Sequence, residues 1–217
     1  MKKLLSMTFI CLCFATLTAG CLFQSNSSTD THVEAASNKD YLKTYQPNPQ
    51  VTDDRTLLKS EDDITDKRGY AKLENINLSQ KSYKIGDITL IIRDVKKIHL
   101  EPTYSMMDYF HVLTQDETFS VVKAFVEITN NSDKSLLFSP VGSLTANTGQ
   151  KWTFEHDIYL DDITGEIKPH ETKKGNIGYV LENGSNPREF TLQTSDIFDN
   201  KEQKVAAGTK IILTLPK

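Results

Sequence analysis

The segment SVVKAFVEITN, residues 120–130, decides the fold class of this chain. Its even-numbered residues from Val122 to Ile128 are all apolar, which is the two-residue period of a strand with one face in a core. The residues that follow, Asn131 to Asp133, tolerate turn backbone, so we expect the chain to reverse there. The segment is therefore predicted to be one strand of an antiparallel pair.

Other short segments of strand-like composition lie on both sides of this one. They are residues 88–95, 136–138, 144–146, 150–154, 177–181, 190–192 and 211–215. About seven or eight short strands separated by turn residues favour an antiparallel β-sandwich. A parallel α/β fold is disfavoured, because no stretch of a dozen residues with a strong helical period connects two of these strands. We predict an all-β sandwich over residues 80–217.

The N-terminus has the layout of a secretory signal. Two lysines precede an uncharged stretch, residues 4–17, and these 14 residues are few for a bilayer core of ~30 Å. The sequence LTAG, residues 17–20, leads directly into Cys21. These residues resemble the lipobox of bacterial lipoproteins (Leu, any, Ala, Gly, Cys). The resemblance implies cleavage before Cys21 and attachment of a diacylglycerol to its thiol.

Residues 1–20 are therefore predicted to be a signal peptide and Cys21 a lipid anchor. The alternative is a plain secreted protein cut elsewhere in the same region. Membrane attachment through the lipid on Cys21 would place the protein on the extracytoplasmic face of the cell membrane.

Residues 21–79 read as a flexible linker. Residues 24–31 are polar with nothing to bury, and two prolines and an acidic cluster follow, so this composition cannot offset the entropy of ordering. The apolar residues Tyr41, Leu42, Leu57 and Leu58 leave open the alternative that short turns of the linker dock on the domain.

The composition of the mature chain excludes several classes of protein. All three cysteines lie in or next to the signal, so a disulfide, a thiolate metal site and a cysteine nucleophile are excluded. Without residues 1–20, 23 basic side chains face 29 acidic ones, and this acidic balance argues against a nucleic-acid partner. No glycine-rich phosphate loop is present, and we predict no cofactor.

The sequence contains no strong catalytic or metal-binding motif. The five histidines of the mature chain show none of the spacings typical of zinc sites, and no nucleophile-elbow motif occurs. Asp108 and His111 would share one helix face, but two ligands alone do not hold an ion. We therefore predict no metal site and no catalytic residues. A solvated loop is the expected role of the polar cluster formed by Asp161, Asp162, Glu166 and His170.

Residues 101–115 combine aromatic and methionine side chains at helical spacing, and we expect a short helix or a loop inserted at the open end of the sandwich. Such a segment most often completes a core. It could also bind a partner, because methionine and aromatic side chains supply adaptable apolar surface. The partner-binding candidates are Tyr104, Met106, Met107, Tyr109 and Phe110, and we expect Tyr109 and Phe110, or their methionine neighbours, to be partly exposed. The single tryptophan, Trp152, is expected in the core.

Three stretches of this sequence resemble one known family. They are VKAFVEITNNSDKSL (residues 122–136), IKPHETKKG (residues 167–175) and FTL (residues 190–192). The family is the uncharacterised immunoglobulin-like domain of Gram-positive lipoproteins, which is related to the mycobacterial immunoprotective extracellular protein. The resemblance implies an extracellular immunoglobulin-like sandwich and brings no catalytic residues. His170 stands where the family usually has glycine, which argues against a strictly left-handed backbone there.

These observations together predict a lipid-anchored, extracytoplasmic protein with one immunoglobulin-like domain. We expect it to be a non-enzymatic binding or envelope-assembly module, with an envelope protein or the cell wall as partner. The alternative is a small metal-dependent or hydrolytic activity at the open end of the sandwich, near Asp108 and His111. A solute-binding component of a transporter is disfavoured, because such proteins usually need two α/β lobes.

Overall fold

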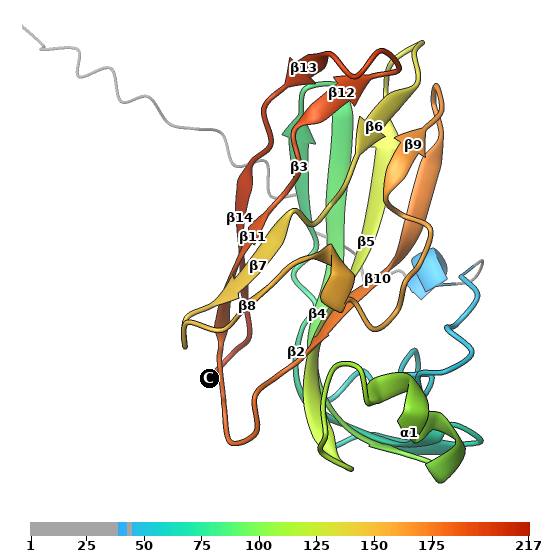
Figure 1. Ribbon diagram of the computed structural model, residues 1–217, viewed down its shortest axis with the longest axis vertical. Coiled ribbons are helices and arrows are strands. Elements are labelled where there is room, and N and C mark those ends of the chain that lie inside the picture. Colours follow the sequence, from blue (N-terminus) through green and yellow to red (C-terminus); the bar gives the residue numbers. More distant parts are fainter. Residues whose placement is uncertain (1–38, 43–44) are drawn as a thin grey trace, which may run out of the picture. The chain divides into compact units, whose positions relative to one another are not determined.

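The computed structural model describes residues 39–42 and 45–217, which form two layers of antiparallel strands (Figure 1). The predicted signal peptide and Cys21 lie outside these described residues. The first layer is the main sheet, in which β3 also pairs with β4. Its strands are β1 (Asp63–Asp66), β2 (Gly69–Asn77), β4 (Ile88–Pro102), β5 (Phe119–Asn130) and β10 (Thr172–Val180), in that order, with β3 (Lys81–Ile85).

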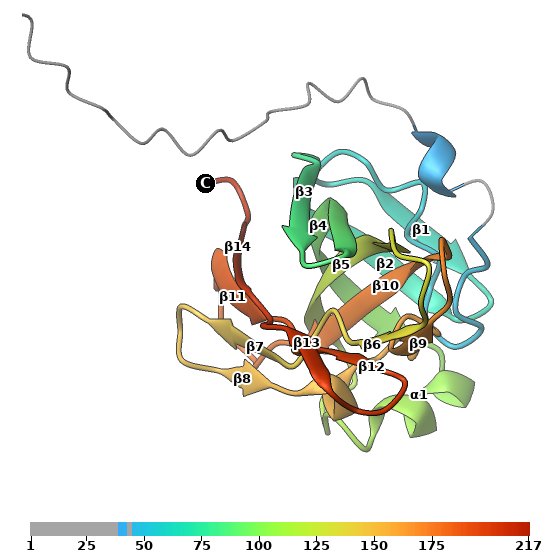
Figure 2. The same ribbon diagram turned by 90° about the horizontal axis from the view of Figure 1, so that it is seen from above.

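Two smaller sheets form the second layer and pack on the inner face of the main sheet (Figure 2). One consists of β14 (Lys210–Thr214), β11 (Glu189–Gln193), β7 (Ser143–Ala146) and β8 (Lys151–Trp152). The other consists of β13 (Lys204–Ala206), β12 (Ile197–Asp199), β6 (Leu136–Phe138) and β9 (Gly165–Ile167). The short helices are η1 (Lys39–Leu42), α1 (Tyr104–Phe110) and η2 (Phe154–His156). The predicted all-β sandwich and the helical insertion within residues 101–115 are confirmed.

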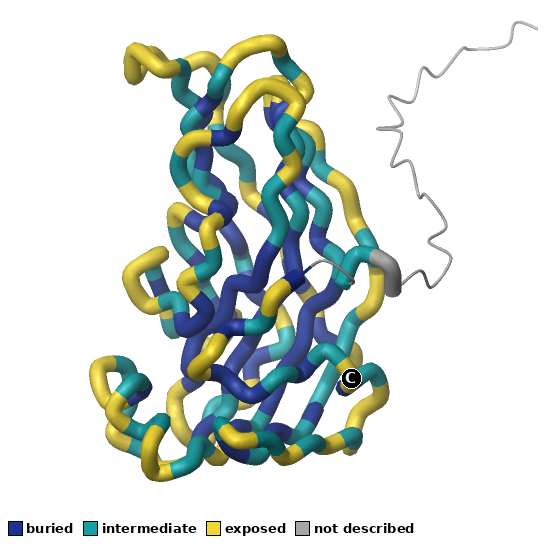
Figure 3. Tube along the Cα trace, turned by 90° about the vertical axis from the view of Figure 1, so that its right-hand side faces the viewer, coloured by how far each residue is buried: buried dark blue, intermediate teal, exposed yellow. Residues whose placement is uncertain are grey.

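The core between the layers follows the alternation seen in the sequence. Val122, Ala124, Val126 and Ile128 of β5 are at most 2% exposed and meet residues of both smaller sheets. The long strands β4 and β5 pair from Ile88 opposite Asn130 to Leu100 opposite Phe119. Figure 3 shows the buried positions running along the strands and the exposed positions gathered in the turns. Trp152 is buried, as predicted.

The folded unit begins well before residue 80, which corrects the expected boundary of the linker. Residues 63–77 form β1 and β2 of the main sheet, where Ala71 and Leu73 are fully buried. Residues 39–42 and 45–58, here called the N-terminal strap, lie against the outer face of this sheet. The strap is hard to recognise in the sequence because its few apolar residues show no helix or strand period, and Val51 and Leu57 are buried against residues of the sheet.

Aromatic and amide side chains dock the strap. The rings of Tyr41 and Tyr45 pack on Phe125 of β5, with centroids 5.1 and 5.2 Å away. The Tyr41 hydroxyl donates to Oδ2 of Asp94 at 2.9 Å, and the Tyr45 hydroxyl accepts from Nδ2 of Asn176 at 2.8 Å. Docking of Tyr41 and Leu57, which the sequence left open, is therefore observed.

A buried charge cluster lies beneath the strap. Oδ2 of Asp54 accepts hydrogen bonds from Nζ of Lys96 at 2.7 Å and from Nζ of Lys123 at 2.8 Å. Lys96 also donates to the Asp54 carbonyl oxygen at 2.8 Å, and all three side chains are at most 4% exposed. Burial alone would raise the pKa of Asp54, but Lys123 and Lys96 outweigh it and hold that pKa well below its usual range.

The turn between β9 and β10 corrects a second expectation. His170 has φ = +57°, so the backbone is left-handed at the position where the resembled family usually has glycine. The turn is closed by Glu171, whose backbone N–H donates to the Lys168 carbonyl at 3.1 Å and whose side chain accepts from the Lys168 N–H at 2.7 Å. The His170 ring lies 2.9 Å from Oδ1 of Asp133. Turn hydrogen bonds and this contact offset the strain that the side chain introduces.

Candidate functional site

Helix α1 connects β4 to β5 and covers one end of the sandwich (Figure 1). Phe110 anchors it, since this side chain is only 2% exposed and its ring lies 5.1 Å from that of Phe119. The hydroxyl of Tyr109 donates to the carbonyl oxygen of Ile158, which ties the helix to the loop after η2. The helix therefore covers an apolar cluster on the outer face of the main sheet, separate from the core between the two layers.

The five partner-binding candidates on α1 do not form a single surface. Tyr104 is 95% exposed, whereas Phe110 is buried. Met106 and Tyr109 are partly buried against the apolar cluster beneath the helix, and Met107 is also partly buried. Of the five candidates only Tyr104 is exposed, whereas Met106, Tyr109 and Phe110 pack on the apolar cluster and hold the helix.

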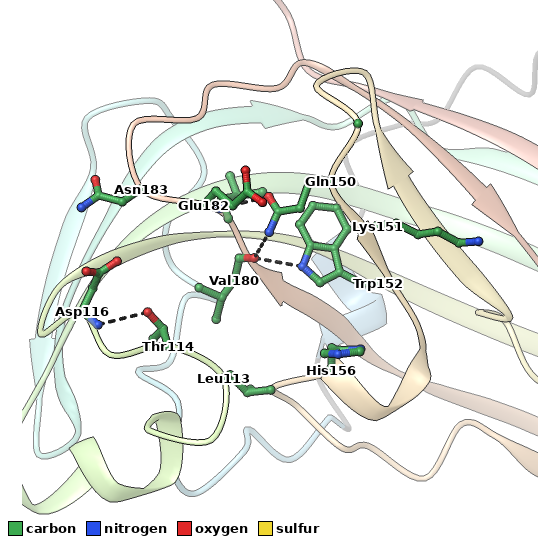
Figure 4. A pocket seen from close by; sticks show the side chains of 12 residues that line it. Leu113, Thr114, Asp116, Gln150, Lys151, Trp152, His156, Val180, Glu182 and Asn183 are labelled. Carbon is green, nitrogen blue, oxygen red and sulfur yellow. Dashed lines mark hydrogen bonds between the residues drawn. The ribbon is translucent and has the colours of Figure 1, made fainter.

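A pocket of about 590 Å³ opens beside the C-terminal end of this segment (Figure 4). It is formed by the loop after α1, the β7–β8 turn, η2 and the end of β10. The lining residues are Leu113, Thr114, Asp116, Gly149, Gln150, Lys151, Trp152, His156, Val180, Leu181, Glu182 and Asn183. Figure 4 shows Gln150, Lys151 and Trp152 on one side of the opening, and Thr114, Asp116 and Asn183 on the other.

One wall of this end pocket is fixed by hydrogen bonds. Nε1 of Trp152 and Nε2 of Gln150 both donate to the Val180 carbonyl oxygen, at 3.0 and 3.2 Å. Oε1 of Gln150 accepts from the backbone N–H of Glu182 at 3.0 Å, and the Trp152 ring packs 5.8 Å from that of Tyr179. These contacts join the β7–β8 turn to the end of β10, so the wall is formed before any ligand arrives.

The rim of the end pocket carries both signs of charge. Glu182, Lys151 and His156 are exposed, and Asp116 is partly buried, with its backbone N–H bonded to the Thr114 hydroxyl at 3.1 Å. Such an arrangement can accept and donate hydrogen bonds to a polar ligand. Within the described residues no group of three or more His, Cys, Asp or Glu side chains could hold a metal ion.

Asp108 and His111 are outside this pocket. Their side chains lie 3.7 Å apart at the C-terminal end of α1, and the Asp108 side chain is fully exposed. The structure therefore does not bring them together with a third catalytic or ligating group. The pocket-lining residues Asp116, Gln150, His156 and Glu182 were missed by the sequence analysis, because four separate segments contribute them and no local motif joins them.

The fold and the end pocket define a β-sandwich domain with a preformed polar pocket. The chain belongs to the family described as "Domain of unknown function (DUF4352)", whose sequence profile matches residues 78–205. β1, β2 and the strap precede this match. The two strands nevertheless belong to the main sheet, and the strap packs on it.

One sequence relative and one solved structure are similar to the chain. It is 38% identical to "Uncharacterized protein YdhF" of Bacillus subtilis over 238 aligned positions, which cover 97% of this chain and 98% of that protein. The fold is similar to a functionally unknown protein of Listeria monocytogenes solved by crystallography, with a TM-score of 0.50 at 13% identity. That likeness covers 68% of this chain and 88% of the solved one, and it shows the fold alone.

Proposed function

We propose that this protein is a lipid-anchored, extracytoplasmic binding or assembly module of the cell envelope, without enzymatic activity. The end pocket carries the proposal of a binding role, because its wall is held by the Trp152 and Gln150 hydrogen bonds to Val180. Preformed concave sites that present a few oriented polar groups are typical of ligand binding. The proposed partner is a polar envelope component, either a protein or the cell wall.

The proposed location is supported by the lipobox-like sequence that ends at Cys21. Among the described residues, no helix is both long enough and apolar enough to cross a membrane. A diacylglycerol with a further acyl chain would exceed the two signals that stable anchoring needs.

Substitution of the lipidated residue tests the anchor. We expect Cys21→Ala to move the protein from the membrane fraction to the soluble fraction, whereas the wild type stays with the membranes after a high-salt wash. Retention of the variant on membranes at the wild-type level would refute lipid attachment at this residue. It would leave the binding role untouched.

Site-specific crosslinking in intact cells tests the binding role. A photoreactive residue at position 183, where exposed Asn183 lines the end pocket, should capture a partner. A matched probe replaces Lys201, which is exposed in the turn between β12 and β13 at the other end of the sandwich (Figure 1). Capture at 183 should be lost when Asp116→Lys and Glu182→Lys reverse the rim charge. Equal capture at both positions would contradict a binding role for this pocket.

A further inference from the structure

A second cavity, of about 170 Å³, lies beside β10, which is the last strand of the main sheet. It shares no lining residue with the end pocket. Several of its lining residues belong to the segment 154–164, which runs beside β10. The lining residues are Ser139, Pro140, Val141, Phe154, Asp157, Leu160, Asp161, Ile163, Thr164, Ile177 and Tyr179. We call it the β10 cavity.

Two carboxylates are fixed at this cavity by the backbone of β10. Oδ1 of Asp157 accepts from the N–H of Gly178 at 2.8 Å, and Oδ2 of Asp161 accepts from the N–H of Asn176 at 2.7 Å. The loop that carries these acids can approach β10 so closely only where the strand has glycine, because a Cβ at Gly175 would lie 2.7 Å from the Asp161 Cβ. A Cβ at Gly178 would likewise lie 2.6 Å from the Tyr159 ring. The loop thus holds both acids in defined positions.

A buried hydroxyl without a partner also lines the β10 cavity. Tyr179 is 1% exposed, and within the described residues its hydroxyl makes no hydrogen bond. A buried polar group in this state is unfavourable, and native proteins rarely keep one without a reason. This hydroxyl is therefore an independent sign that the cavity receives a polar group.

The rim of the cavity is apolar and strained. Phe154 and Leu160 are 58% and 66% exposed, so both large side chains face solvent. Leu160 also has φ = +52°, a left-handed conformation that is costly for leucine. Strain of this kind concentrates at functional sites.

The wall of the β10 cavity carries no cationic side chain, and the one basic group that acts on Asp161 is Lys123, which lowers its pKa by less than burial raises it. Within the described part of the chain neither Asp157 nor Asp161 forms an ion pair. Burial raises the pKa of Asp157 to about 7 and also raises that of Asp161. A bound cation would favour the ionised forms of both.

We infer that the β10 cavity binds an alkylammonium group. The ammonium lies at the acidic end formed by Asp157, Asp161 and the Tyr179 hydroxyl, and the alkyl stem lies between Phe154 and Leu160. Two sources share this chemistry, a lysine side chain of a partner protein and a free primary amine.

The test is a titration of the full chain in detergent micelles with n-butylammonium chloride, followed by amide NMR shifts. The amides of Gly178 and Asn176 should report binding, since they donate to the two carboxylates. So small a ligand should bind with a dissociation constant on the order of millimolar. Butanol, which has the same stem without the charge, and sodium chloride should leave these amides unmoved.

Three variants make the test specific. Tyr179→Phe should weaken binding several-fold while the thermal midpoint stays equal or rises, because the unpartnered hydroxyl is removed. Asp157→Asn should weaken binding about tenfold or more, whereas Asp162→Asn, an exposed neighbour outside the cavity, should have no effect. Binding that neither Tyr179→Phe nor Asp157→Asn changes, or no binding at tens of millimolar, would overturn the inference.

The pH dependence gives an independent readout. Asp157 is influenced by Asp161 and faces Tyr109, Tyr159 and Tyr179, and His156 precedes it in the chain. Since the carboxylate is the binding form, affinity should fall as the pH is lowered through about 7. An affinity that rises with acidity would contradict the assignment.

Capped tripeptides with lysine or norleucine between glycines distinguish the two sources. Tighter binding of the lysine peptide than of n-butylammonium assigns the site to a partner protein's lysine. Equal binding of the two assigns it to a free amine. Binding of the norleucine peptide as tight as that of the lysine peptide would refute the ammonium requirement.

Discussion

The two faces of the main sheet are buried by different chemistry. The inner face packs mainly apolar side chains against the two smaller sheets, and its buried Asn130 donates hydrogen bonds to the Ile167 and Lys168 carbonyl oxygens. The outer face is apolar beneath α1, where Leu73, Ile98 and Val121 are buried. Beneath the strap it also holds buried charge, with Lys96 and Lys123 on Asp54. A buried apolar side chain can pack against many other apolar side chains, whereas a buried charge needs a partner of opposite charge in the correct position. One sheet is thus covered by general hydrophobicity on one side and by specific charge pairing on the other.

The largest expected effect comes from removing the shared anion. Asp54→Ala removes the carboxylate that neutralises two buried lysine ammonium groups, and we expect it to cost about 3–5 kcal/mol of the free energy of unfolding. Denaturant melts measure this cost. Asp63→Ala, at an exposed position of β1, is the control and should cost less than about 0.5 kcal/mol.

Replacement of all three residues of the charge cluster shows whether the loss of stability in Asp54→Ala comes from leaving the lysine charges unpaired. The triple variant Asp54→Leu, Lys96→Met, Lys123→Met should stay within about 2 kcal/mol of the wild type, because similar apolar volumes can replace a buried ion pair. A triple variant as unstable as Asp54→Ala would show that the outer face requires the charges themselves.

A matched pair of leucine truncations compares the two faces directly. Leu90→Ala, on the inner face of β4, should cost about 2–5 kcal/mol, because the two packed layers cannot collapse around the cavity. Leu57→Ala in the strap removes an equally buried side chain but should fall at the low end of this range, since a surface segment can relax. Equal costs in denaturant melts would show that the strap is packed as rigidly as the core.

The outer face should also give the stability a pH dependence that the inner face lacks. The folded-state pKa of Asp54 is depressed, so its contribution is present above the unfolded value of about 3.9 and is lost as the pH falls. Burial lowers the pKa of Lys123, but Asp54 and Asp94 outweigh burial and raise it. The contribution of Lys123 to stability is therefore complete below the unfolded-state pKa of about 10.4 and is lost at higher pH.

Comparison with the triple variant isolates this pH dependence. The stability of the wild type minus that of the triple variant should be flat between about pH 5 and pH 9 and should fall outside that window. Urea melts across the pH range measure it. A difference that stays constant down to about pH 2 would contradict the role of the Asp54 carboxylate.

The smallest expected effect is at the edge of the strap. Tyr41→Phe removes the hydrogen bond to Asp94 but keeps the ring on Phe125, so we expect a loss of about 1 kcal/mol in denaturant melts. Water can replace the hydroxyl, since Tyr41 is partly exposed. A loss as large as that of Asp54→Ala would mean that this single bond fastens the strap.

The sequence predicted the elements whose position depends on a local pattern of apolar residues. Alternation from Val122 to Ile128 identified strand β5, and the aromatic segment at residues 101–115 identified the helix at the sandwich end. The end pocket could not be predicted, because Asp116, Gln150, His156 and Glu182 approach one another only after strands distant in the chain have paired. The β10 cavity could not be predicted either, because nothing in the sequence distinguishes Asp157 and Asp161 from exposed loop residues. Their contact with β10 depends on the space left by Gly175 and Gly178.

By itself, the sequence determined that the chain builds an antiparallel sandwich, because a two-residue apolar period can bury its apolar side only in a layered sheet structure. That polar residues such as Asn48 and Asp54 belong to the folded unit follows from the packing of distant segments and not from local pattern. The physical reason is that the free energy of burying a charge depends on its partner. Nothing near Asp54 in the sequence identifies Lys96 and Lys123 as the groups that it meets.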